Sequence, residues 1–119
     1  MRVGDEGLRA QKEIQQLFRE GAAYHGKLVV LILRQPEEGP RKVLFVASRR
    51  VGGAVRRNRA KRLMREAYRG IAPHLKSNRG HLGWIARARC AHASMPEARA
   101  EMLMLLERAN LWDTVTELS

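Results

Sequence analysis

Residues 49–69 read RRVGGAVRRNRAKRLMREAYR, and the spacing of charged and apolar groups in this stretch decides how the rest of the chain is read. Nine of its 21 residues are Lys or Arg, and Glu66 is its one acid. A helix over residues 55–69 gathers one set of small and apolar side chains on a single arc: Ala60, Leu63, Met64, Ala67 and Tyr68. The opposite arc carries Asn58, Arg59, Lys61, Arg62, Arg65 and Arg69. One face therefore suits a core, and the other suits a row of phosphates.

The spacing of the basic residues on this helix adds detail. Arg57, Lys61 and Arg65 recur at i, i+4 and i+8, so they form a line on one flank, and Arg62 and Arg69 continue the neighbouring flank. Arginine suits phosphate binding because its planar guanidinium donates two parallel hydrogen bonds and stacks on bases. Gly52 and Gly53 allow a tight turn at the helix entrance, and Asn58 either reads a base edge or braces that turn.

Charge over the whole chain supports a polyanionic partner. The net charge is +11, and residues 39–96 hold 15 Lys or Arg and one acid, a net of +14 that leaves −3 for the flanks. A solvated surface usually mixes signs, so mere solubility explains this block poorly. Nucleic acid is the natural partner. We expect no membrane partner, because the apolar arc is rich in Ala and Met and lacks Trp or Phe anchors.

Length and composition indicate the number of domains and the cellular compartment. The chain has 119 residues, 45% of them hydrophobic, which fits one RNA-binding domain over residues 1–119 with a frayed end from about residue 114. It has no apolar run of about 18 residues and no secretory signal at its start. Cys90 is the single cysteine, so no internal disulfide forms. Together these features predict a cytoplasmic protein.

Periodicity and turn residues predict the other elements. Helices are expected over residues 8–20 and 96–110, the second opened by a capping box of Ser94 and Glu97. Strands are expected over residues 27–33, 41–48 and 81–88, with a hairpin turn at 35–40 and a helical turn before 77–80. Trp84 and Tyr68 are expected in the core. The order predicts a small α+β sandwich with helices on one face of a sheet, the other face needing a cover or a ligand.

A longer run of residues resembles a known family. Residues 43–69, VLFVASRRVGGAVRRNRAKRLMREAYR, resemble the signature of the protein subunit of bacterial ribonuclease P. The matching elements, in order, are Ala47-Ser48-Arg49-Arg50, Gly52, Ala54-Val55, Arg57-Asn58-Arg59, Lys61-Arg62 and Arg65-Glu66. The resemblance extends more loosely to the first helix, to residues 85–88 and to the last helix.

The resemblance implies a fold and a function. The fold would be a single αβββαβα domain with a four-stranded sheet and a left-handed βαβ crossover, against the usual right-handed rule. The partners would be ribonuclease P RNA and precursor tRNA, and the holoenzyme would be an endoribonuclease that removes the 5′ leader. The RNA subunit would perform the hydrolysis with a bound divalent metal such as Mg²⁺, held mainly by RNA, while the protein supplies affinity and substrate discrimination.

The resemblance also implies the site residues. The RNA-binding set would be Arg49, Arg50, Arg57, Asn58, Arg59, Lys61, Arg62, Arg65 and Arg69. Ile14 and Phe18 would line a cleft for the leader, although their spacing suits a core stripe equally well. Ile14 stands where the family usually has an aromatic, and Leu44 where it commonly has Gly. With 5% aromatics, the cleft is expected to use phosphate and apolar contacts more than stacking.

The sequence predicts no catalytic group and no metal site in the chain itself. Cys90 and His92 have no second pair at zinc spacing, and hydrolase motifs are missing. Paired acids for two-metal hydrolysis are missing from the basic centre. Two alternatives stay open: an RNA-binding protein of ribosomal type without a role in cleavage, and a DNA-binding module. The second is disfavoured because the glycine turn and flanking strands do not resemble a helix-turn-helix, so no DNA partner is expected.

Overall fold

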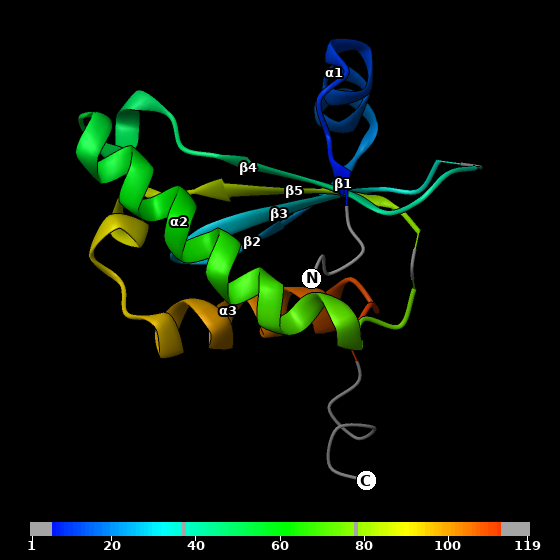
Figure 1. Cartoon of the computed structure of the whole chain (residues 1–119). Coiled ribbons are helices and arrows are strands. Elements are labelled where there is room, and N and C mark those ends of the chain that lie inside the picture. The colour runs from blue at the N-terminus through cyan, green and yellow to red at the C-terminus, as the bar shows by residue number, and fades with distance from the viewer. Residues whose placement is uncertain (1–5, 37, 78, 113–119) are drawn as a thin grey trace, which may run out of the picture.

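The computed structural model describes residues 6–36, 38–77 and 79–112, and it contains one mixed sheet with helices on both faces (Figure 1). The elements, in chain order, are β1 (Glu6–Gly7), α1 (Gln11–Glu20), β2 (Ala22–His25), β3 (Val29–Arg34), β4 (Lys42–Val46), η1 (Arg49–Val51), α2 (Ala54–Ile71), η2 (Ala72–His74), β5 (His81–Ala86), η3 (Ala88–His92) and α3 (Met95–Arg108). The strand order is β1-β4-β5-β3-β2. The α+β class is confirmed, with four main strands and the two-residue β1 at one edge.

The pairing of β4 with β5 defines the topology. These strands are parallel neighbours, whereas β3 pairs antiparallel with β5 and β2 pairs antiparallel with β3. A parallel pair needs a crossover, and α2 provides it. In Figure 1 β4 lies nearer the viewer than β5 and α2 passes beneath the sheet, so the crossover is left-handed, as the family resemblance implied.

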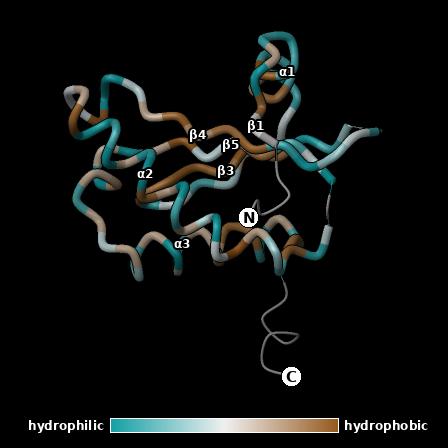
Figure 2. The backbone as a smooth tube through the Cα atoms, viewed as in Figure 1, coloured by the Kyte–Doolittle hydropathy of each residue, from teal (hydrophilic) through white to brown (hydrophobic). Residues whose placement is uncertain are grey.

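The helices divide between the two faces of the sheet. The larger core lies between the sheet and the pair α2 and α3, and it includes the fully buried side chains of Trp84, Leu31, Met64 and Met102. Figure 2 shows the hydrophobic colour concentrated along the central strands. The expectation that all helices share one face is wrong, because α1 covers part of the other face (Figure 1). Its Leu17 is fully buried there against Ile32.

The N-terminal elements begin differently from the prediction. The first helix begins at Gln11 and not at residue 8, because Leu8 belongs to the strand connection. The backbone N–H of Leu8 donates to the carbonyl of Val43 at 2.9 Å, and the Leu8 side chain is buried beside Leu17. The residues did not place β1 or β2, although the family resemblance implied a fourth strand in the sheet. The C-terminal fraying expected from residue 114 lies outside the described residues.

The last helix follows its local signals. The backbone N–H of Glu97 donates to Ser94 Oγ at 3.3 Å, and Ser94 N–H donates to Glu97 Oε1 at 3.0 Å, which is the predicted capping box. This bonding lowers the pKa of the Glu97 carboxyl. The inner face of α3 buries Ala98, Met102, Leu105 and Leu106.

Candidate RNA interface

The entrance to α2 is built by the predicted glycine turn. After β4, Ser48 Oγ accepts the N–H of Arg50 at 3.3 Å and begins the short helix η1. Gly52 then adopts a φ of 137°, a conformation that side chains disfavour, and an added Cβ would lie 2.7 Å from Arg56 Cδ. Gly53 is the N-cap residue of α2. The turn thus brings Arg49 and Arg50 next to the start of the basic helix.

The two faces of α2 separate as predicted. Ala60, Met64, Ala67 and Tyr68 are at most 2% exposed and pack against the sheet and α3, with Leu63 half-buried beside them. Tyr68 packs at a ring-centroid distance of 5.9 Å from Phe45 of β4. The helix orientation is therefore fixed by its apolar side, and the charged side has no freedom to rotate inward.

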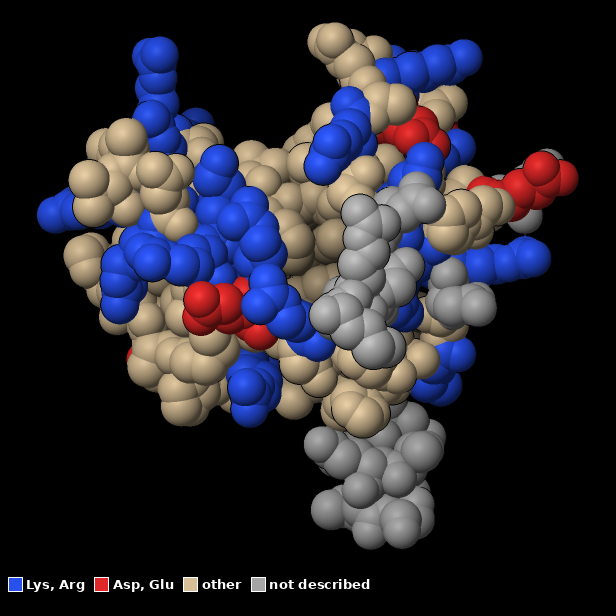
Figure 3. Space-filling model, in the orientation of Figure 1, with Lys and Arg blue, Asp and Glu red and all other residues tan. Residues whose placement is uncertain are grey.

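The line of cations falls on one flank of this fixed helix. Arg57 and Lys61 are half-buried, and Arg65 is exposed, with its guanidinium carbon 5.6 Å from the centre of the Phe45 ring. Arg62 and Arg69 are exposed on the neighbouring flank. Figure 3 shows Lys and Arg side chains gathered over α2, beside a hollow that separates them from α1.

These cations are not neutralised internally. In the described part of the chain, none of the basic side chains of α2 forms an ion pair with a carboxylate. Glu66, on the same helix, is exposed. The positive field of α2 therefore faces outward, where it is available to an anionic partner.

Arg59 is the exception within the predicted set. Its guanidinium donates to the backbone carbonyl of Ala91 in η3, so it joins α2 to the segment after β5. Asn58 is exposed, and its side chain makes no hydrogen bond to the described residues. The structure therefore gives no support to a bracing role for Asn58 at the turn.

The opposite face of the sheet carries the second predicted site. α1 is held there by Leu17, and Ile14 is half-buried in the same cluster. Phe18 is 47% exposed, so it is not a core residue. Beside α1 the sheet presents half-buried apolar side chains from three strands: Val30, Leu44, Val46 and Ile85. A ligand on this surface would contact the apolar side chains of the sheet and the exposed ring of Phe18.

A polar contact fixes the position of α1 over the sheet. Glu13 Oε1 lies 3.2 Å from Lys42 Nζ on β4, and Glu13 Oε2 lies 3.7 Å from His81 Nε2 on β5. His81 is 3% exposed and its Nδ1 has no hydrogen-bond partner in the described residues. Burial lowers the pKa of His81, against the opposing effect of the Glu13 carboxylate. Nothing in the sequence singled out Glu13, because its partners come from distant strands.

Comparison with known proteins identifies the family. The model of the ribonuclease P family, described as "Ribonuclease P", matches residues 4–110. This chain belongs to the ribonuclease P protein family. It is 34% identical over 105 residues to the ribonuclease P protein component of Symbiobacterium thermophilum, covering 87% of this chain and 90% of the relative. It is 33% identical over 114 residues to that of Dehalococcoides mccartyi, covering 92% and 89%.

Solved structures of ribonuclease P proteins share the fold. The protein from Thermotoga maritima aligns with a TM-score of 0.74 at 25% identity, covering 87% of this chain and 96% of that one. The protein from Staphylococcus aureus aligns with a TM-score of 0.77 at 19% identity, covering 89% and 96%. As a ribonuclease P protein, the chain is a component of a tRNA-processing endoribonuclease with an RNA partner.

Not every basic residue of this ribonuclease P protein is available to RNA. Arg41 is buried and donates to the carbonyls of Ser77 at 2.5 Å and Ala72 at 2.9 Å, so it serves the fold. The described residues contain no cluster of three His, Cys, Asp or Glu side chains able to hold a metal ion. Within those same residues, no helix is long and apolar enough to cross a membrane.

Proposed function

We propose that this chain binds the catalytic RNA of ribonuclease P through α2 and binds the 5′ leader of precursor tRNA on the sheet face beside α1. It thereby assists endonucleolytic removal of the leader. The observation that carries the proposal is the flank of Arg57, Lys61 and Arg65, held by a buried helix face and unpaired with any carboxylate in the described residues. Such a line matches successive phosphates of an RNA backbone.

The placement of α2 favours tight phosphate contacts. Arg57 and Lys61 are half-buried, and Arg65 rests against the Phe45 ring, so these side chains lose less freedom on binding than fully solvated ones. Arg49 and Arg50, just before the helix, and the exposed Arg62 and Arg69 extend the same field. Asn58 is free to reach a base edge, whereas Arg59 contributes mainly by holding η3 against α2.

The surface beside α1 supports the leader part of the proposal. The exposed ring of Phe18 offers a stacking platform, and Ile14 supplies an apolar neighbour. The half-buried side chains of Val30, Leu44 and Ile85 form the adjoining floor. Because rings are few, we propose that one base stacks on Phe18, that other leader bases are held by apolar contact, and that cations hold the phosphates.

Chemistry in the holoenzyme is assigned to the RNA. The basic surface of α2 offers Glu66 as its only acid, so its donor set does not fit a site for Mg²⁺. We therefore propose that the RNA subunit holds most of the divalent metal and carries out hydrolysis. On this proposal the protein works in the cytoplasm, and its side chains add affinity and discriminate precursor from mature tRNA.

Reconstitution tests this function directly. Purified chain is added to ribonuclease P RNA at a Mg²⁺ concentration that leaves the RNA alone nearly inactive, and cleavage of precursor tRNA is measured. We expect the chain to restore cleavage at the mature 5′ end. RNA binding without any gain in cleavage would instead indicate an RNA-binding protein of ribosomal type. Preferential binding to duplex DNA in competition would indicate a DNA-binding module.

A further inference from the structure

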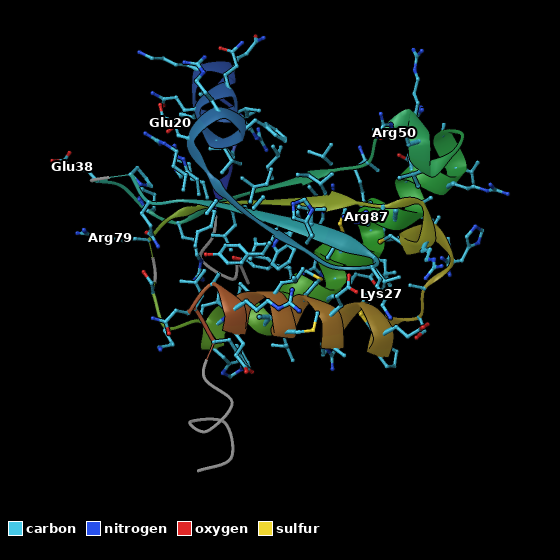
Figure 4. The ribbon with its side chains drawn as sticks, turned by 180° about the vertical axis from the view of Figure 1, so that it is seen from behind. Glu20, Lys27, Glu38, Arg50, Arg79 and Arg87 are labelled. Carbon is cyan, nitrogen blue, oxygen red and sulfur yellow. The ribbon has the colours of Figure 1, made fainter. Side chains whose placement is uncertain are left out.

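One end of the sheet collects cations from three separate connections. β4 and β5 are parallel, so both end there, and Val29 at the start of β3 pairs with Ala86 at the end of β5. The β2–β3 turn therefore lies at the same end. The residues that follow these strands or form the turn are Arg49, Arg50, Arg87, Arg89 and Lys27, here called the cationic end. In Figure 4 Arg50, Arg87 and Lys27 lie along one side, with Glu20, Glu38 and Arg79 on the other.

A cavity opens below Lys27, between the β2–β3 turn, η3 and α3. Its volume is about 910 Å³, and its apolar lining comes from Leu28, Ala93, Ala100 and Met104. Met104 is 41% exposed, which is unusual for a large apolar side chain of this protein. Cationic side chains line the rim: Lys27, Arg89 and Arg108. The cavity therefore suits a ligand that combines a flat or apolar part with negative charge.

Two acids, Glu97 and Glu101, also line this cavity, and both carboxylates accept hydrogen bonds within the fold. Glu101 accepts three backbone N–H groups from the β2–β3 turn, those of Lys27 at 2.8 Å, Leu28 at 2.6 Å and Val29 at 2.8 Å. Glu97 is bonded to Ser94 in the capping box. The side chains of Lys27 and Arg89 are exposed and make no ion pair with a described carboxylate. The rim thus presents Lys27 and Arg89 with neither side chain paired to a described carboxylate.

The cationic end is continuous with α2. η3, which carries Arg89, packs against both η1 and α2, and Arg59 donates to the carbonyl of Ala91 in η3. A strand of RNA that meets Arg49 and Arg50 at the start of α2 thus has further cations to contact in Arg89 and Lys27. Continuity with the proposed RNA surface favours RNA over an acidic polypeptide as the occupant.

We infer that the RNA-binding surface extends from α2 around the cationic end, and that the cavity under Lys27 takes an unpaired nucleotide of the same RNA. Phosphates contact Arg89 and Lys27, and the base lies on Leu28, Ala93 and Met104. The nucleotide is unpaired because a paired base in a duplex cannot enter a concave cavity. This inference rests on the proposed function and adds a second contact region to it.

Charge removal at the two ends of the sheet tests the inference. The variant Lys27→Ala/Arg89→Ala is compared with Lys12→Ala/Arg79→Ala, which removes two exposed cations elsewhere. Binding to full-length ribonuclease P RNA is measured over a range of salt concentrations. We expect the slope of log K against log salt to fall in magnitude by about 1.4 for the first variant, at about 0.7 per phosphate contact on a single strand, and to stay unchanged for the second. Equal slopes for the two variants would overturn the inference.

A filled cavity gives an independent readout. Ala100 is exposed on α3 and lines the cavity, so Ala100→Phe adds a ring there without changing charge. We expect about a tenfold loss of RNA affinity with an unchanged salt slope, whereas wild-type affinity would contradict a base in the cavity. Thermal melting of each variant reports whether the fold is kept.

Two further comparisons show whether a negative result contradicts this inference alone or the proposed function as well. If Arg57→Ala/Lys61→Ala/Arg65→Ala loses RNA binding and Lys27→Ala/Arg89→Ala does not, the inference fails and the proposed function stands. If neither variant loses binding, the proposed function fails as well. Polyglutamate is titrated in parallel, and loss of polyglutamate binding with intact RNA binding would assign the cavity to an acidic protein and contradict the inference.

Discussion

At the scale of single residues, the exposure of one aromatic side chain on α1 points to binding and not to core packing. Phe18 and Leu17 are neighbours on α1, yet Leu17 is fully buried and Phe18 is 47% exposed. The helical spacing of the apolar residues could not tell which of them faces the sheet. The exposed ring is costly in water and contributes little to the core, so a role in binding accounts for it better than packing does.

Phe18→Ala tests that role. We expect weaker binding of precursor tRNA carrying a 5′ leader, by roughly 1–3 kcal/mol if one base stacks on the ring, with little change for mature tRNA. Holoenzyme affinity for the two ligands, measured side by side, gives the ratio. An equal loss for both ligands would remove Phe18 from the leader site.

His81 predicts how stability depends on pH. Its pKa in the folded protein lies below the ordinary value of 6.5, because burial disfavours the charged ring. The unfolded chain therefore takes up the proton first as pH falls, and the free energy of unfolding decreases from about pH 6.5 downward. Urea unfolding at pH 7.5 and pH 5.5 should show this decrease in the wild type and a smaller one in His81→Gln. The same decrease in both proteins would assign the effect to other groups.

Elements could be predicted where their signals are local. The faces of α2 and the cap of α3 follow from residues a few positions apart, so both were expected correctly. β1 is two residues long and exists because it pairs with β4, more than 30 residues further along the chain. β2, with the sequence AAYH, has little intrinsic strand preference and depends on β3 and on Glu101 of α3. Such long-range pairing leaves no pattern in a short window of sequence.

The carboxylate of Glu101 is predicted to hold the β2–β3 turn. It accepts three backbone N–H groups, and Gly26 allows its approach, since an added Cβ there would lie 2.5 Å from Glu101 Oε2. Glu101→Ala leaves these donors without their partner and should lower the free energy of unfolding by about 1–3 kcal/mol. Hydrogen exchange should show faster exchange at Lys27, Leu28 and Val29 than elsewhere in the sheet. Unchanged exchange at those amides would contradict the clamp.

At the scale of the whole molecule, the basic residues predicted as one RNA-binding set have two roles: most face an RNA partner, and Arg59 holds η3 against α2. The expected partner and fold could be inferred from the ordered run at residues 43–69, because the charged arc and the glycine turn lie close together in sequence. The hydrogen bond from Arg59 to the carbonyl of Ala91 could not be foreseen, because the two residues lie 32 positions apart in sequence. The grouping of Lys27, Arg87 and Arg89 at one end of the sheet could not be foreseen either, because only the strand order brings these residues together.

The central claim is that the flank of α2 binds RNA phosphates, and the salt dependence of RNA binding measures it most directly. Arg57→Ala/Lys61→Ala/Arg65→Ala is compared with the wild type and with Arg9→Ala/Lys12→Ala/Arg79→Ala, which removes three exposed cations away from α2. The first variant should keep its circular dichroism spectrum and lose about 2 to 3 from the magnitude of the salt slope, at about 0.7–0.9 per phosphate. A slope equal to that of the wild type, with the fold intact, would contradict the claim.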